Sequence, residues 1–304
     1  MTGFWAEALQ LVSCTHDGGR LRLTSPIPHS HVDEGEVSCA SCGRVYPIQD
    51  GILDLLLTDT PANDDSRHEM NLREGEHQLL RGSPGSRMDW RDDAEIETTI
   101  DRIGDVTGKT VLELGCGPGA YTRKLTSAAG LLAVDFSWTA LRKNRQQLPD
   151  HARVGLVRAD VATLRLAAGA FDLALATLYS NLPTRALRLE CNRTVAEALR
   201  PAGRYFVLAH HQDQRRVLKG LPVSGYYSRG GIFYECLTPS TLRAELRDFQ
   251  VLSIDPVCIE LPLVSRISND RWRKWIAMRA DRIPGIKRFG SLLLATVEKA
   301  PGPN

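Results

Sequence analysis

The sequence predicts an α/β protein: a mostly parallel sheet with helices on both faces, preceded by a small β-rich head. Three observations support this. From about residue 86 to 260, short apolar runs alternate with helical stretches, as in a parallel sheet. A glycine-rich turn follows the first of these runs. Residues 9–57 alternate short apolar runs with Gly, Pro and Cys, which is typical of small strands and tight turns.

The composition is that of a globular chain. Its 304 residues are 42% hydrophobic and 24% charged, enough to bury a core. The 38 basic and 36 acidic residues leave a formal charge of +2, so the total indicates neither a nucleic acid nor a membrane partner. No apolar run approaches the roughly 18 residues of a membrane span, and the start lacks the regions of a secretory signal. We therefore expect a cytoplasmic protein with no membrane partner.

The chain is predicted to divide into three parts. A head spans 1–57, a polar linker with few apolar residues spans 58–85, and the α/β domain spans 86–304. Nothing in these parts indicates an oligomeric state.

Five apolar runs are the predicted central strands, at 109–114, 131–135, 153–159, 171–178 and 203–210. The helix before the last of them, 184–199, repeats an apolar residue every four positions and begins at the N-cap Thr184. In the tail, a helix from Thr238 to about Asp248 precedes strands near 250–258 and at 290–299. An arginine-rich helical insertion, 263–288, lies between those two strands and is a candidate lid.

The central motif is VLELGCGPGA at 111–120, where a buried strand runs into a glycine turn. Glycines let the backbone approach a ligand closely, and the small Cys116 fits among them. The spacing also matches a dinucleotide fingerprint, but two residues argue against a pyrophosphate. Glu113 suits a cationic group such as an amino-acid ammonium, and Pro118 removes an amide that a phosphate would need. The loop glycines are Gly115, Gly117 and Gly119.

Two further acids end the next two strands. Asp135 lies 20 positions after Gly115 and can accept both hydrogens of a ribose diol. Asp160 can accept from an adenine amino group. Because ligands of open α/β sheets bind at the carboxyl ends of strands, the acids should converge on one crevice.

The motifs ELGCGPG, AVDFS, RADV, FDLALA and ALRPAGRY, in that order and spacing, resemble class I S-adenosylmethionine-dependent methyltransferases of the type 11 kind. The resemblance covers roughly 105–300 and implies a Rossmann-like, seven-stranded, mostly parallel sheet whose antiparallel strand is 290–299. It further implies that Glu113 and the Gly115–Gly119 loop hold the methionine part of the cofactor, and Asp135 its ribose. Adenine would be held by Asp160 and Val161, with Phe136 packed on it.

The head contains a metal knuckle, Cys39-x-x-Cys42, whose turn presents two thiolates to one ion, and Cys14 is a third candidate thiolate. The stretch resembles the zinc-ribbon heads of some bacterial methyltransferases and of ribosomal-RNA guanine methyltransferases, whose remaining cysteine falls on Asp17. We favour His16 as the fourth ligand because imidazole is the better partner in a thiolate zinc site. The alternatives are Asp17, His29 and His31. Four protein ligands would make the zinc structural.

Candidate catalytic residues follow the fourth and fifth strands. Tyr179 comes after the fourth strand, and His210-His211 end the fifth. Imidazole titrates near neutrality, so one of the two histidines is the candidate general base; a structural histidine pair is the alternative. Tyr226, Tyr227 and Tyr234 are candidate walls of the acceptor site.

The predicted function is methyl transfer from S-adenosylmethionine to a small-molecule acceptor, such as a secondary metabolite. The near-neutral charge and the lid-like insertion favour that acceptor over a polymer. The first alternative is an RNA methyltransferase that binds RNA through 263–288, a segment that contains eight basic and two acidic residues. The second is a cofactor-binding regulatory protein without turnover. The sequence leaves the acceptor atom open among O, N and C.

Overall fold

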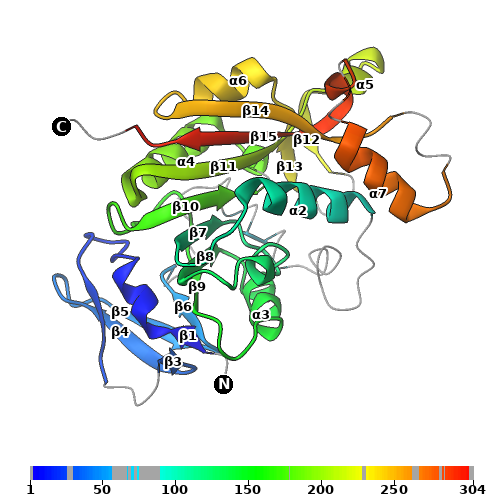
Figure 1. Cartoon of the computed structure of the whole chain (residues 1–304). Helices are drawn as coiled ribbons and strands as arrows, with labels where there is room; N and C mark the ends of the chain where they lie inside the picture. Colours follow the sequence, from blue (N-terminus) through cyan, green and yellow to red (C-terminus); the bar gives the residue numbers. More distant parts are fainter. Residues whose placement is uncertain are drawn as a thin grey trace.

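One mixed sheet of eleven strands runs through the part of the chain that the computed structural model describes (Figure 1). That part comprises 3–25, 30–56, 67, 70–71, 74, 90–177, 179–227, 231–261, 267–280, 283 and 285–300. The strand order is β14-β15-β11-β10-β7-β8-β9-β6-β5-β4-β2. Two separate two-stranded pairs, β1 with β3 and β12 with β13, lie outside it.

The strands of the head are β1 (Phe4–Trp5), β2 (Leu21–Leu23), β3 (His31–Val32), β4 (Gly35–Cys39), β5 (Val45–Gln49) and β6 (Ile52–Asp54). The later strands are β7 (Thr110–Leu114), β8 (Gly130–Asp135), β9 (Val154–Arg158), β10 (Phe171–Ala176), β11 (Leu199–His210), β12 (Ser224–Tyr226), β13 (Phe233–Glu235), β14 (Gln250–Ile259) and β15 (Gly290–Glu298). The α-helices are α2 (Trp90–Ile103), α3 (Trp138–Gln146), α4 (Arg185–Ala198), α5 (Gln214–Leu218), α6 (Pro239–Glu245) and α7 (Asp270–Arg279). Short 3-10 helices include η1 (Ala6–Gln10), η3 (Thr122–Lys124), η4 (Tyr179–Asn181) and η7 (Lys287–Phe289).

Seven of these strands, β9-β8-β7-β10-β11-β15-β14, form the predicted α/β sheet. Strands β7 to β11 are parallel to one another, and β15 is antiparallel to both β11 and β14. The Rossmann-like fold class is therefore confirmed. The predicted N-caps also form: the hydroxyl of Thr184 accepts from Leu187 N and that of Thr238 from Thr241 N. The helix α6 ends at Glu245, three residues earlier than predicted.

The sheet does not stop at seven strands, because the head extends it. Strand β6 pairs in parallel with β9, with Asp54 opposite Arg158. The backbone N–H of Leu55 donates to Arg158 O at 2.9 Å, and an ion pair of 3.2 Å joins the side chains of Asp54 and Arg158. Both side chains are nearly buried, 11% and 4% exposed. The head is thus an edge of the main sheet rather than an appendage beside it (Figure 1).

The head also packs on the face of the sheet. A β-carbon at Gly130 would meet the ring of Trp5, and one at Gly155 would meet Ala8, so these glycines admit β1 and η1 against β8 and β9. One hydrophobic cluster contains residues of both parts. The predicted boundaries 1–57, 58–85 and 86–304 remain predictions, and most of the linker lies outside the described residues.

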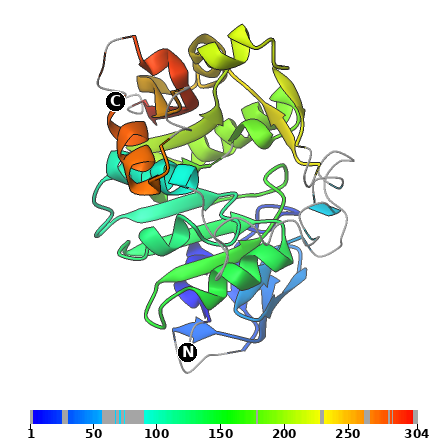
Figure 2. The same ribbon diagram turned by 90° about the vertical axis from the view of Figure 1, so that its right-hand side faces the viewer.

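Within the predicted insertion 263–288, helix α7 forms and packs on α2 through Ala277, Trp90 and Ala94. Figure 1 shows α7, α5 and β12 at one end of the molecule, the end toward which β10 points, and this end faces the viewer in Figure 2. Arg266 and Arg282 lie outside the described residues. No helix that the structure describes is long and apolar enough to cross a membrane.

Candidate active site

A cavity of about 110 Å³ opens at the carboxyl ends of the central strands, beside the glycine turn. We call it the glycine-loop cavity. Asp135 and Phe136 follow β8, Ala159 and Val161 follow β9, and Tyr179 and Asn181 follow β10. Its lining also includes Leu114, Gly115, Val134, Ala176, Thr177, Leu182 and Cys191.

The glycine turn requires its glycines. Gly115, Gly117 and Gly119 have φ of 68°, 51° and 89°, a region that side chains with a β-carbon rarely adopt. A β-carbon at Gly119 would also collide with the buried side chain of Asn144. The turn is tied to β8, because Gly117 N donates to a carboxylate oxygen of Asp135 at 2.9 Å. Ser137 N donates to the other oxygen at 2.9 Å, so the Asp135 carboxylate is held at the edge of the cavity.

Glu113 lies beneath the turn and is fully buried. The Thr122 hydroxyl donates to one of its oxygens at 2.7 Å, while the other has no hydrogen-bond partner among the described residues. Burial raises the pKa of Glu113 to about 8. A buried carboxyl with an unused oxygen fits a cationic group brought onto the turn. Glu113 is not in the lining of the cavity itself.

A second cavity, of about 380 Å³, adjoins the first, and Asn181 lines both. We call it the His210 cavity. The side-chain oxygen of Asn181 is buried and has no hydrogen-bond partner among the residues described. The ionisable lining comprises His210, Tyr227, Cys258, Arg91, Asp92, Glu95 and Glu260. The lining thus contains three carboxylates and one guanidinium. That guanidinium belongs to Arg91 and pairs with Glu260 at 3.2 Å.

The two predicted histidines have different surroundings. His210 lines the His210 cavity, and its Nε2 hydrogen-bonds the Tyr227 hydroxyl. His211 is 7% exposed, and its Nδ1–H donates to Gly290 O at 2.6 Å. Burial lowers the pKa of His211. It does not line either cavity, so the structure favours His210 of the two.

Tyr179 borders the glycine-loop cavity, but its hydroxyl belongs to a buried network. It donates to Glu245 at 3.1 Å and accepts from Asn192 at 2.9 Å. Arg188, itself fully buried, holds Glu245 with two hydrogen bonds of 2.9 Å. Burial, reinforced by Glu245, raises the pKa of Tyr179 above its ordinary range. These contacts indicate that Tyr179 holds η4 in place and forms part of the cavity wall, and that it does not transfer protons.

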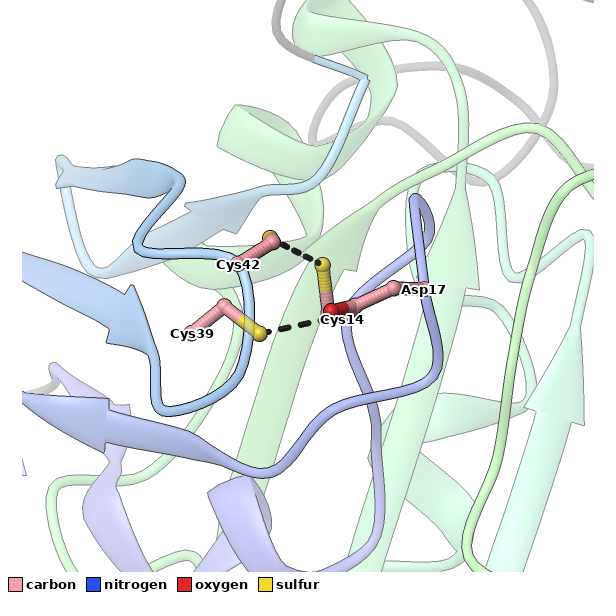
Figure 3. A group of neighbouring side chains, drawn as sticks. All are labelled: Cys14, Asp17, Cys39 and Cys42. Carbon is pink, nitrogen blue, oxygen red and sulfur yellow. Dashed lines mark hydrogen bonds between the residues drawn. The ribbon is translucent and has the colours of Figure 1, made fainter.

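Four head residues converge at one point: Cys14, Asp17, Cys39 and Cys42 (Figure 3). Their sulfur and carboxylate atoms all lie within 4.8 Å of one another. The Sγ atoms of Cys14 and Cys42 are 3.7 Å apart, and Cys39 Sγ lies 3.3 Å from Asp17 Oδ1. A tetrahedral ion with Zn–S bonds of about 2.3 Å would set two sulfurs about 3.8 Å apart, so the spacing fits zinc.

Two residues next to this cluster, Tyr46 and Gly19, help to position its side chains. The Tyr46 hydroxyl, fully buried, lies 2.9 Å from Cys14 Sγ, where it orients a ligand sulfur. Gly19 N donates to Asp17 at 2.9 Å and is the main reason that the pKa of Asp17 is lowered to about 2. A β-carbon at Gly19 would lie 2.5 Å from Cys39 Sγ, so only glycine fits there.

The comparisons with known proteins agree with both parts of this geometry. Residues 111–203 match the family described as Methyltransferase domain, and residues 7–51 match the family described as Trm112p-like protein. The α/β part of the chain is therefore similar to the methyltransferase-domain family, and the head is similar to Trm112p-like proteins. The predicted likeness of the head to ribosomal-RNA guanine methyltransferases is not confirmed.

Similar proteins cover the methyltransferase domain. Phosphoethanolamine N-methyltransferase 1 of Arabidopsis thaliana is 28% identical over 218 residues, which are 67% of this chain and 43% of that protein. The chain therefore spans less than half of that relative. A Mesorhizobium loti S-adenosylmethionine-dependent methyltransferase has a TM-score of 0.50 at 23% identity, over 67% of this chain and 97% of that one. A complex of the Haloferax volcanii Trm112 methyltransferase activator with a putative methyltransferase has a TM-score of 0.51 at 16% identity, over 71% and 91%.

These findings confirm the cofactor expected of the methyltransferase domain and support a zinc site in the head. Of the predicted cofactor residues, Gly115, Asp135, Phe136 and Val161 line the glycine-loop cavity. Others are buried behind it or shape the turn: Glu113, Cys116, Gly117, Gly119 and Asp160.

The metal prediction changes at one position. His16 is exposed and is not in the cluster; Asp17, one residue later, takes its place. His31 is not in the cluster either, since its Nε2 lies 3.0 Å from Ala152 O, and His29 lies outside the described residues. His16 was favoured on ligand chemistry, whereas the spacing of the cysteine motif already placed Asp17 in register, and Gly19 N holds the Asp17 carboxylate at the cluster.

Three residues of these sites escaped the sequence reasoning: Tyr46, Asn144 and Gly19. The first two are buried polar side chains whose partners lie 32 and 22 positions away in the chain, Cys14 and Thr122. No local pattern signals such partners. Gly19 follows a cysteine motif closely, and a glycine pair after a metal-ligand motif is the signal that could have identified it.

Proposed function

We propose that this protein transfers a methyl group from S-adenosylmethionine to a small molecule through a hydroxyl or amino group. The observation that carries the proposal is the junction of the two cavities at Asn181. One cavity lies at the position where this fold binds its ligand, and the other is large enough to hold a separate molecule.

The residues of the first cavity fit the cofactor. Asp135 sits at the strand end expected for a ribose diol, and Phe136 and Val161 offer apolar surface for an adenine ring. The unused oxygen of Glu113 supports an ammonium group near the glycine turn. When bound, the cofactor supplies an electrophilic methyl group on a sulfonium.

The residues of the second cavity support an acceptor with a hydrogen on its nucleophilic atom. For an amino acceptor, the unused oxygen of Asn181 can accept one N–H and thereby orient the lone pair of the nucleophile, which leaves another hydrogen for the base. A hydroxyl acceptor has a single hydrogen, which goes to the base. His210 is proposed to take the proton as the new bond to the methyl carbon forms and the carbon–sulfur bond breaks. Tyr227, hydrogen-bonded to His210, is proposed to hold that ring.

Charge favours a small neutral or cationic acceptor. Asp92, Glu95 and Glu260 line the His210 cavity, and carboxylates there repel the phosphates of a nucleic acid. RNA remains the second candidate because of the basic helix α7. Several of its cations are already paired, however: Arg273 with Asp270, Lys274 with Glu97, and Lys287, after α7, with Asp255.

For the head, we propose a structural zinc held by Cys14, Asp17, Cys39 and Cys42. Four protein ligands would leave no position open for catalysis. Through β6 the head forms one edge of the catalytic sheet, so we expect the metal to stabilise the sheet as well.

The test is a label-transfer experiment. The protein is incubated with methyl-labelled S-adenosylmethionine and, separately, with a small-molecule extract and with total RNA. We expect label in the small-molecule fraction, and a strong loss of transfer for Asn181→Ala. Asn181→Ala should keep its affinity for S-adenosylhomocysteine within a few fold, because Asn181 serves the acceptor in this scheme.

Other results would decide against the proposal. Label in RNA alone would assign the protein to the second candidate. Cofactor binding by calorimetry without transfer to either fraction would favour the regulatory alternative. No binding of S-adenosylhomocysteine by the wild type would refute the enzyme altogether. His210→Gln should lower turnover at neutral and higher pH, with a smaller loss at low pH where a protonated histidine cannot accept a proton. An unchanged rate across this range would remove the base assignment.

A further inference from the structure

Large apolar side chains are exposed on two segments of this protein, 217–227 and 272–283. Of the eleven such side chains that are exposed in the described part of the chain, nine lie on these segments. Leu218 is the most exposed, at 73%, and Trp272 and Trp275 are 59% and 51% exposed. We call the two segments together the rim surface. Its other principal members are Val217, Leu221 and Ile283.

The first segment reaches the His210 cavity, and the second packs on helix α2, which supplies part of the lining of that cavity. Tyr227, from the first, lines that cavity. Glu260, also in its lining, pairs with Arg215 of α5 at 2.5 Å and with Arg91 of α2 at 3.2 Å. Helix α2 in turn holds α7, where Lys274 pairs with Glu97 at 2.5 Å. Ion pairs thus link Glu260 of the cavity lining to α5 and α2, and a separate ion pair links α2 to α7. Helices α5 and α7 both lie at the end of the molecule that faces the viewer in Figure 2.

The charge of the rim surface is positive. The exposed charged side chains in the described part of the two segments are basic: Lys219 on the first and Arg279 on the second, with Arg271 directly before Trp272. On α7 the exposed face carries Arg271, Trp272, Trp275 and Arg279, and the Arg279 guanidinium lies 5.6 Å from the Trp275 ring. The exposed acid Asp270 is paired with Arg273.

We propose that the rim surface docks this protein onto an anionic phospholipid bilayer, with the His210 cavity opening toward the lipid. Tryptophan and arginine together are typical of helices that lie in a bilayer interface, and basic side chains add attraction to anionic headgroups. Exposed apolar patches that border a binding site mark an interaction surface. The proposal does not depend on which molecule the enzyme methylates.

A bilayer fits these side chains better than RNA does. Aromatic rings and arginines would serve either partner, because bases stack on aromatic rings. Aliphatic side chains cannot stack on bases, and they are stabilised only when they move from water into an apolar phase. The exposed aliphatic residues here are Val217, Leu218, Leu221 and Ile283. The proposal differs from the expectation of no membrane partner, because total charge does not depend on which apolar side chains are exposed or where they lie.

The test is co-sedimentation of the full chain with two kinds of vesicle: phosphatidylcholine alone, and phosphatidylcholine mixed with phosphatidylglycerol. We expect binding to the mixed vesicles that weakens with salt, and little binding to phosphatidylcholine alone. The Trp272→Ala/Trp275→Ala variant should lose at least about tenfold in affinity. The Arg271→Gln/Arg279→Gln variant should lose roughly 30-fold for its two charges.

Leu252→Ala is the matched control. Leu252 is 45% exposed but lies near the start of β14, at the end of that strand away from Glu260 and α7. It should bind vesicles as the wild type does, and all variants should melt at the wild-type temperature because the altered side chains are exposed.

Three results would overturn the proposal. The first is no binding of the wild type to mixed vesicles at low salt. The second is single-stranded RNA binding that the rim variants lose while vesicle binding is absent, which would assign the surface to RNA. The third is self-association in light scattering that the same variants abolish, without vesicle binding, which would make the surface an interface between copies of this chain.

Discussion

The ion pair between Asp54 and Arg158 joins the head to the methyltransferase domain, and Asp54→Asn tests what that connection contributes. The two side chains are 3.2 Å apart and only 11% and 4% exposed. Arg158 also donates through Nε to Phe136 O at 3.1 Å, and Phe136 lines the glycine-loop cavity. Asp54, on the head, therefore supports a cofactor-site residue through one arginine.

The expected loss follows from burial. Removing one partner of a buried pair costs about 3–5 kcal/mol, since the remaining charge stays in a poorly solvated place. Arg158 keeps its bond to Phe136 O and its position 5.3 Å from the Trp138 ring, which favours the lower end, about 3 kcal/mol. That is a large fraction of the roughly 5–15 kcal/mol that stabilises a typical domain.

The control is Asp50→Asn, which makes the same chemical change in a neighbouring pair. Asp50 bonds Arg142 at 2.9 Å, but the side chains are 49% and 53% exposed. A pair so exposed contributes about 0–1 kcal/mol. Asn also tolerates the φ of 52° at this position.

Urea unfolding measures the free energy, and calorimetry with S-adenosylhomocysteine measures the cofactor affinity. We expect Asp54→Asn to unfold at clearly lower urea and to bind the cofactor product more weakly, while Asp50→Asn changes neither. If the two variants lose the same free energy, within about 0.5 kcal/mol, burial does not decide the strength of this pair and the reasoning is wrong.

Three further predictions concern the sites. Mass spectrometry should find one zinc per wild-type chain and per His16→Ala chain, and a strong loss in Asp17→Ala and Cys39→Ser; metal lost on His16→Ala would restore the sequence prediction. Gly19→Ala should lose zinc as well, because its β-carbon would lie 2.5 Å from Cys39 Sγ, and retention would show that the loop can move. Glu113 has a folded pKa of about 8 against an ordinary 4.5, so its contribution to stability is present below pH 4.5 and is lost as the pH rises through 8. The free energy of unfolding of the wild type should therefore fall by about 1.4 kcal/mol per pH unit over that range, with a matching fall in melting temperature, and Glu113→Gln should lack this fall. Parallel curves for the two proteins would contradict this reasoning.

The sequence determined what depends on neighbouring residues. Apolar runs bounded by glycine and polar residues located the central strands, and Thr184 and Thr238 located two helix starts, because caps and strand patterns act over a few positions. The sequence also predicted that the glycine turn and Asp135 lie together, since parallel strands end at the same edge of a sheet, and Gly115 and Asp135 line one cavity in the structure.

Only the tertiary structure decided what depends on distance in space. Asp17, and not His16, lies in the cysteine cluster, and His210, and not His211, lines a cavity; these placements support our proposals for the two sites. The union of head and domain depends on β6 meeting β9 about a hundred positions later in the chain. The rim surface likewise joins segments some fifty residues apart. Local sequence patterns do not predict such contacts, because these hydrogen bonds and ion pairs form between residues that are far apart in the sequence.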